Sequence, residues 1–167
     1  KDIKDYLLDG KVKSAKALCG KFDSPIARMI ETGIARIGKP LSDVQTAVDN
    51  VGNAEIARLE NGLPYLATIA GGAPMLGFLG TVTGMIKAFF NMANAGNNID
   101  ISLLSGGIYE AMITTVGGLI VGLIAYFAYN FLTAKVSNVV FKMENATIDF
   151  MSLLSETSGE QTETANE

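Results

Sequence analysis

The stretch APMLGFLGTVTG, residues 73–84, decides the fold of this chain. It carries no charge, yet Pro74 stands near its start and Gly77, Gly80 and Gly84 interrupt it. In a soluble helix each of these glycines would cost about 1 kcal/mol relative to alanine. Glycine and proline are common in membrane-spanning helices, where small residues let two helices approach closely. We therefore predict a transmembrane helix that packs against another helix.

Two long segments of the chain are free of charge. Residues 61–86 and 111–134 contain no Asp, Glu, Lys or Arg. Because a helix rises about 1.5 Å per residue, each segment can cross a hydrocarbon core about 30 Å thick. The sequence thus predicts an all-α integral membrane protein whose two transmembrane helices cover residues 61–90 and 105–135.

The basic residues predict the orientation of these helices. No Lys or Arg lies between Lys87 and Lys135, whereas ten lie before residue 60. Loops rich in Lys and Arg stay in the cytoplasm. We expect both ends of this chain to be cytoplasmic and residues 91–104 to form a short turn on the far side of the membrane.

The segment before the first span, residues 1–60, reads as cytoplasmic and helical. Ser24 is suited to cap a helix that has Pro25 at its first position, and Gly38 is a plausible stop for that helix. A further helix is expected from about Ser42, with a break near Gly52.

Beyond the second span, apolar residues recur at helical spacing through residues 136–154. These residues are Val136, Val140, Met143, Phe150 and Leu154. The second helix is therefore expected to continue into the cytoplasm with an apolar seam for a neighbour. Residues 155–167 carry four acids and no base, and are expected to form a disordered acidic tail.

Composition argues against several classes of function. The chain has no histidine and one cysteine, so an internal disulfide is excluded and neither a metal site nor a cofactor is expected. Cys19 is expected to be a buried thiol on a helix. The net charge of −4 gives no basic patch for nucleic acid. Neither a nucleophile–base pair nor a phosphate-binding loop is present, so no enzyme activity is expected.

Each predicted span separates into a small-residue face and a large-residue face when residues are placed about 100° apart. The small faces contain Ala70, Ala73, Gly77, Gly80, Thr81, Gly84 and Ala88 in the first span, and Ala111, Thr115, Gly118, Gly122 and Ala125 in the second. The large faces contain Met75, Leu79, Val82, Ile86 and Phe89, and Ile113, Val116, Ile120, Ile124 and Phe127. Large residues are expected toward lipid. The small faces fit two interpretations: a hairpin packed against itself, or an assembly around a narrow shared interior.

A few polar residues stand out in these spans. Thr81 and Thr115 lie on the small faces, whereas Thr83 does not. A threonine in a membrane helix often only bonds back to a carbonyl of its own helix. Glu110 is either a carboxylate at the start of a helix, favoured by the helix dipole, or a group that faces protein or water near the outer edge of the span.

Two longer stretches resemble the last two membrane helices of the MotA/TolQ/ExbB proton-channel family, and ExbB members most. They are IAGGAPMLGFLGTVTGMIKAF, residues 69–89, and GGIYEAMITTVGGLIVGLIAYFAYNFL, residues 106–132. DYLLDGKVKSAKALCGKFDSPIARMI, residues 5–30, is similar to the cytoplasmic segment that follows the family's first span. That first span has no counterpart here, so we take the chain as a processed product or part of something longer.

The resemblance implies a homo-oligomer, usually a pentamer, that forms a central pore around single-pass helices of an ExbD-type partner. That partner would bring the essential carboxylate. Protons crossing the bacterial inner membrane would drive motion that energises a TonB-like protein. By motif, Thr81 and Thr115 match the family's polar residues and Glu110 its acidic residue. TolQ-like and gliding or flagellar stator subunits are sister interpretations, and a membrane scaffold that anchors a cytoplasmic helical domain is one from another class.

Overall fold

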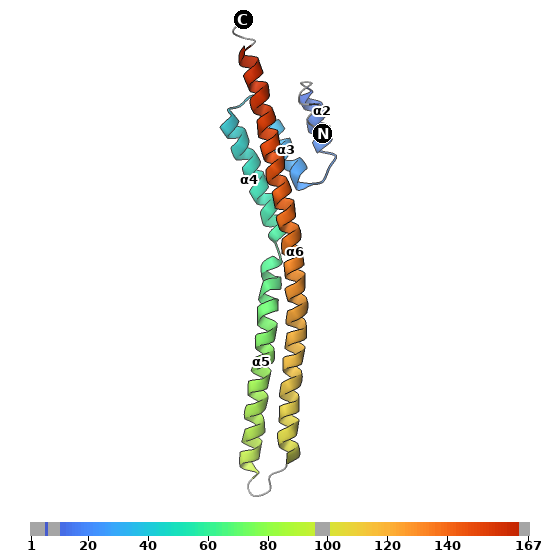
Figure 1. Ribbon diagram of the computed structural model, residues 1–167, viewed down its shortest axis with the longest axis vertical. Coiled ribbons are helices and arrows are strands. Elements are labelled where there is room, and N and C mark those ends of the chain that lie inside the picture. Colours follow the sequence, from blue (N-terminus) through green and yellow to red (C-terminus); the bar gives the residue numbers. More distant parts are fainter. Residues whose placement is uncertain (1–5, 7–10, 96–100, 164–167) are drawn as a thin grey trace. The chain divides into compact units, whose positions relative to one another are not determined.

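The computed structural model describes Tyr6, residues 11–95 and residues 101–163, with the side chains at 103 and 157–163 left out. The chain divides into two compact units (Figure 1). The helical unit is Lys1–Glu60 with Lys135–Glu167, and the hairpin unit is Asn61–Ala134. Helix α6, Ile101–Glu163, contributes residues to both units.

Within residues 11–60 of the helical unit, three helices precede the hairpin. They are α2 (Val12–Cys19), α3 (Pro25–Ile34) and α4 (Leu41–Glu60). The Ser24 hydroxyl accepts a hydrogen bond of 3.2 Å from the amide of Ala27, and Pro25 is the first residue of α3, so the predicted cap is confirmed. Helix α3 ends at Ile34, before the expected stop at Gly38. Gly38, at φ 94°, lies instead in the turn that leads to α4, because only glycine adopts that conformation freely.

The core of the helical unit joins α2, α3 and α4 to the C-terminal part of α6. Cys19, Met29, Val48, Met143 and Phe150 are buried in it, which confirms that the thiol is buried on a helix. The seam predicted for residues 136–154 therefore packs against helices of the same chain.

Gly33 makes room for the largest side chain of this core. A Cβ at Gly33 would overlap the ring of Phe150 and lie 3.0 Å from Val48 Cγ2. Removal of a buried phenylalanine ring costs about 3–5 kcal/mol. The contact between Gly33 and Phe150 is therefore a main anchor of α6 in this unit.

Helix α4 runs unbroken through Gly52, so the predicted break is wrong. A Cβ at Gly52 would lie 2.9 Å from Met29 Cε. The residue is glycine because α3 approaches α4 closely at this point, and tertiary packing outweighs the low helix propensity of glycine.

The hairpin unit pairs α5, Leu63–Asn94, with residues 101–134 of α6, and the two run side by side (Figure 1). Gly62, at φ 99°, separates α5 from α4. The helices extend into the predicted turn 91–104 from both sides, and residues 96–100 lie outside the described residues.

At the other end, α6 continues to Glu163, so residues 155–163 are helical where the sequence predicted disorder. No proline interrupts them, and adding residues to an existing helix avoids the cost of nucleation. The rest of the predicted tail, residues 164–167, lies outside the described residues.

Two helical stretches, Leu41–Asn94 and Leu104–Glu156, are long and apolar enough to cross a membrane. Their most apolar windows are only 6% and 17% buried within the chain. The core helix of a soluble protein would be mostly buried, so this exposure favours contact with lipid.

Candidate functional site: the α5–α6 contact and its hydroxyl groups

Glycines bring α5 and α6 into backbone contact. A Cβ at Gly77 would lie 3.1 Å from the main-chain oxygen of Thr114, and one at Gly118 would lie 2.5 Å from that of Ala73. Neither position has room for a side chain. This close approach is the packing that small residues permit between membrane helices.

The same contact continues along both helices. A Cβ at Gly84 would lie 2.9 Å from that of Ala111, and one at Gly80 would overlap the side chain of Thr114. A Cβ at Gly122 would lie 2.5 Å from the ring of Pro74. All five glycines assigned to helix packing, Gly77, Gly80, Gly84, Gly118 and Gly122, thus lie against the opposite helix.

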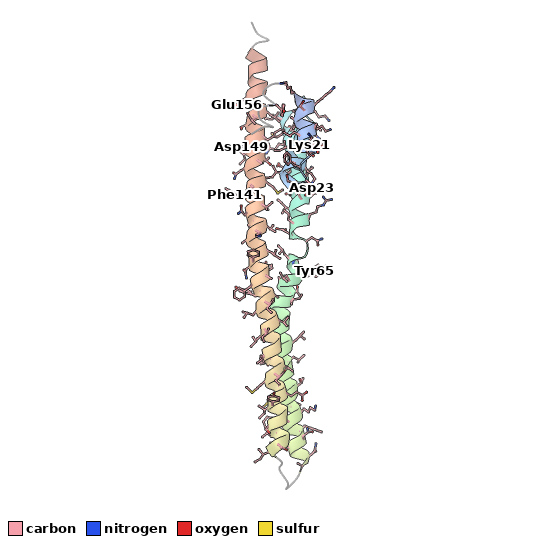
Figure 2. All side chains as sticks on the ribbon, turned by 90° about the vertical axis from the view of Figure 1, so that its right-hand side faces the viewer. Lys21, Asp23, Tyr65, Phe141, Asp149 and Glu156 are labelled. Carbon is pink, nitrogen blue, oxygen red and sulfur yellow. The ribbon has the colours of Figure 1, made fainter. Side chains whose placement is uncertain are left out.

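The large residues point away from this contact. Side chains project outward along α5 and α6 (Figure 2). The exposed ones include Met75, Leu79, Val82, Ile86, Phe89, Ile113, Val116, Ile120, Ile124 and Phe127. The small faces therefore meet inside one chain, as in the first of the two interpretations. Whether small residues also line an interior shared between chains stays a prediction.

Thr115 makes a polar contact between the two helices. Its hydroxyl donates to the main-chain oxygen of Gly77 at 3.1 Å and lies 3.5 Å from that of Ala111 in its own helix. The hydroxyl can reach α5 because Gly77 has no side chain to hold the helices apart. Thr115 is thus a residue of the hairpin contact.

Thr81 has a different environment from Thr115. Its hydroxyl donates to the main-chain oxygen of Phe78 at 2.6 Å, within α5. The half-buried side chain borders a shallow apolar depression lined by Val82, Met85, Ile86, Phe89 and Phe90. Thr83 is exposed and also bonds its own helix, to Leu79 O at 2.9 Å. The structure gives the hydroxyls of Thr81 and Thr115 separate partners.

Glu110 is exposed on the surface of α6. Helix α6 begins at Ile101 and has no acidic residue in its first turn, so Glu110 stands well inside the helix. The dipole effect is confined to the first turn. The interpretation of Glu110 as a helix-start carboxylate is therefore wrong, whereas a group that faces protein or water remains.

Thr114 lies in the contact between α5 and α6, although it was not predicted from the sequence to belong to the small face. Its hydroxyl donates to Ala111 O at 2.7 Å, while its side chain occupies the space above Gly80. The available signal was its spacing from Ala111 and Gly118, which puts it beside the small face.

The helical unit also contains a buried carboxylate, Glu55, that was not predicted from the sequence. Glu55 accepts hydrogen bonds from Arg28 at 3.0 and 2.7 Å, and from Arg58 at 3.1 Å. Arg28 also pairs with the exposed Asp23. The signal was the helical spacing of Glu55 after Val48 and Gly52, which places it on the buried face of α4.

The hydrogen bonds between Arg28 and Glu55 favour the charged form of both side chains. The paired hydrogen bonds from Arg28 lower the pKa of the Glu55 carboxyl, against the opposing effect of burial, and the nearby charges of Arg28 and Arg58 lower it further. The same bonds raise the pKa of Arg28. The pair therefore stays ionised and links α3 to α4.

Comparison with known proteins now supplies a family. The model of the MotA/TolQ/ExbB proton channel family matches residues 21–145. A putative biopolymer transport protein ExbB homolog of Methanothermobacter thermautotrophicus is 32% identical over 142 residues, which are 85% of this chain and 50% of that protein.

Two further relatives carry different names. The Tol-Pal system protein TolQ of Haemophilus influenzae is 36% identical over 102 residues, 61% of this chain and 44% of that protein. The biopolymer transport protein ExbB of Xanthomonas campestris pv. campestris is 35% identical over 101 residues, 60% of this chain and 40% of that protein. The chain thus spans half or less of the length of these relatives. Since the family model covers α3, α4, α5 and most of α6, the chain belongs to the MotA/TolQ/ExbB proton channel family.

Proposed function

We propose that this chain is the channel-forming subunit of a proton-driven motor of the ExbB type in a bacterial inner membrane. The observation that carries the proposal is the family match over residues 21–145, which includes both α5 and the apolar part of α6. The exposed large residues of the hairpin suit a lipid environment or other membrane helices. Both ends of the chain are on the cytoplasmic side in this proposal.

The hairpin has few groups that can hold or pass a proton. Between Asn61 and Ala134 the ionisable side chains within α5 and α6 are those of Lys87, Glu110 and four tyrosines, Tyr65, Tyr109, Tyr126 and Tyr129. Glu110 is the only carboxylate among these groups, and the family resemblance implies that the essential carboxylate of the relay lies on another chain. We assign it to a single-pass ExbD-type partner, enclosed by several copies of this chain, with a pentamer as the expected number.

In this arrangement the hydroxyls of Thr81 and Thr115 flank the path and Glu110 marks its outer entrance. Both hydroxyls donate to main-chain oxygens in the structure, so each can accept from a protonated carboxylate as it stands. To donate to a charged carboxylate, each hydroxyl has to leave its present carbonyl partner. The machine energised in this proposal is TonB-dependent outer-membrane transport. The name of the Xanthomonas relative, a biopolymer transport protein, supports a role in transport and does not say which machine is energised.

A TolQ-like role is the second candidate, supported by the 36% identity to the Haemophilus protein. The single-pass protein that copurifies with the chain separates these two roles. The alternative of a scaffold without channel activity is tested with liposomes that contain the chain and its partner, where proton flux would rule it out.

The decisive test is therefore flux and energised uptake with four variants. Thr81→Val, Thr115→Val and Glu110→Ala should lower both, while Thr83→Ala leaves them unchanged. Assembly on native gels is measured in parallel, because Glu110→Ala can also act through subunit contacts. Full flux in the first three variants would overturn the assignment of the path, and no flux in the parent complex would overturn the channel itself.

A further inference from the structure

The helical unit contains a cavity lined by basic side chains, which has no role in the proposed channel. The cavity, of about 580 Å³, is bordered by α2, α3, the turn that follows α3, and Val51 of α4. Four basic side chains line it: Lys16, Arg28, Arg36 and Lys39. Glu31 is the only acidic residue among its lining. Small-molecule sites commonly have volumes of about 300–1,000 Å³.

Three of the four basic groups are uncommitted in the part of the chain that the structure describes. Arg28 is engaged by Asp23 and Glu55. By contrast, no ion pair or side-chain hydrogen bond to another described residue is formed by Lys16, Arg36 or Lys39. Their charges are available to a ligand.

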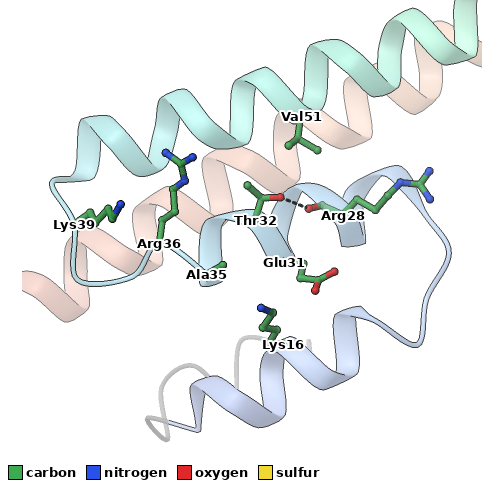
Figure 3. A pocket seen from close by; sticks show the side chains of 8 residues that line it. All are labelled: Lys16, Arg28, Glu31, Thr32, Ala35, Arg36, Lys39 and Val51. Carbon is green, nitrogen blue, oxygen red and sulfur yellow. Dashed lines mark hydrogen bonds between the residues drawn. The ribbon is translucent and has the colours of Figure 1, made fainter.

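These groups come from different segments and border one space. Figure 3 shows Lys16 rising from α2 toward α3, where Glu31 lies, while Arg36 and Lys39 stand beyond the end of α3. Thr32 adds a hydroxyl oxygen whose proton is already donated to Arg28 O at 2.9 Å. The fork of an arginine fits two phosphate oxygens, and a lysine adds a point charge.

We propose that this cavity binds a phosphate-bearing anion, held by Lys16, Arg36 and Lys39. Several separated cations around one concave space suit a compact, multiply charged group better than a single carboxylate. The anion is either free in the cytoplasm, as in a polyphosphate, or the headgroup of an anionic lipid. Glu31 weakens the binding, because its charge repels the anion across the same cavity.

Lysine acetylation footprints, read by mass spectrometry on the full chain, test the proposal. In neutral detergent, inorganic pyrophosphate should protect Lys16 and Lys39 but leave Lys13 reactive. Lys13 is the matched control, because it is exposed on α2 and does not line the cavity. The second arm compares nanodiscs of phosphatidylcholine alone with nanodiscs that also contain phosphatidylglycerol. Protection by pyrophosphate identifies a free anion, and protection by phosphatidylglycerol alone identifies a headgroup.

Substitutions test whether each charged side chain strengthens or weakens binding of the anion. Arg36→Gln should raise the dissociation constant for the protecting anion about threefold to tenfold, since the contact is charged but exposed. Glu31→Gln should lower that constant, and Lys13→Gln should leave it unchanged. Protection of Lys13 to the same extent as Lys16, or no protection in either arm, would overturn the proposal.

Discussion

The hydroxyl of Thr115 on α6 donates a hydrogen bond to the main-chain oxygen of Gly77 on α5, 3.1 Å away. This bond depends on the absence of side chains at Gly77 and Gly118, where the two backbones meet. A Cβ at Gly77 would lie 3.1 Å from Thr115 Cα and 3.2 Å from Gly118 Cα. Close backbone packing and the interhelical hydrogen bond are thus one feature of the hairpin.

Thr115→Val removes this bond with little change of shape. We expect a loss of about 0.6–1 kcal/mol in the stability of the hairpin, the usual value of a hydrogen bond between membrane helices. The measurement is denaturant-induced unfolding of the chain in detergent. Thr83→Val is the control, since Thr83 bonds only carbonyl groups of its own helix. Equal stability of the two variants would show that the bond from Thr115 to Gly77 contributes nothing.

Gly117 and Gly118 are adjacent, yet alanine should affect them in opposite ways. A Cβ at Gly118 would lie 2.5 Å from Ala73 O, whereas one at Gly117 meets nothing within 4 Å. Overpacking costs about 1–3 kcal/mol, so Gly118→Ala should destabilise the hairpin by that amount. Gly117→Ala should be neutral or stabilising by up to about 1 kcal/mol through helix propensity. Thermal unfolding of both variants in the same detergent decides the matter, and a stable Gly118→Ala chain would contradict the packing described.

The ion pair of Arg28 and Glu55 should make the helical unit sensitive to acid. The pKa of Glu55 is lowered in the folded chain, chiefly by hydrogen bonds from Arg28. The pair therefore stabilises the fold fully above the ordinary glutamate pKa of about 4.3, and this contribution is lost as the pH falls below it. Glu55→Gln should be less stable than the parent at neutral pH, and the difference should shrink in acid.

Urea unfolding of the full chain, followed by circular dichroism across this pH range, measures that difference. Glu60→Gln, an exposed position at the end of the same helix, serves as the control. A gap between parent and Glu55→Gln that is constant with pH would argue against an ionised pair.

Cys19 should resist thiol reagents in the folded chain. The thiol is 1% exposed, and burial is the main cause of its raised pKa, with the charge of Glu31 as a further cause. Reaction requires an exposed thiolate, so a maleimide should label Cys19 slowly until urea unfolds the helical unit. Fast labelling of the native chain would show that the contact of α2 with the core opens readily.

The orientation of the hairpin is tested with cysteines at two other positions. In a Cys19→Ala background, Asn97→Cys should react with an impermeant maleimide on intact cells and Ser137→Cys should not. The reason is the absence of Lys and Arg between residues 87 and 135. The reverse pattern would place both ends of the chain outside the cytoplasm.

The sequence by itself determined that this protein is helical, that two of its stretches are long and apolar enough to cross a membrane, and which family it belongs to. Long uncharged segments such as 61–86 are typical of membrane-spanning helices, and the glycines of residues 73–84 predict close helix packing. The cap at Ser24 was also predictable, because capping is local chemistry between residues three apart.

Tertiary structure decided what the glycines and the polar groups contact. Gly52 reads as a helix breaker by propensity, but Met29 occupies the space that its side chain would take. Thr81 and Thr115 look equivalent on their small faces, yet only Thr115 bonds the facing helix, because the exact rotation of α5 against α6 selects the partner. The pairing of Arg28 with Glu55 joins residues 27 positions apart, and only the packing of α3 on α4 brings them together. Local patterns fix the elements, whereas contacts between distant residues depend on how side chains of several helices fill one space.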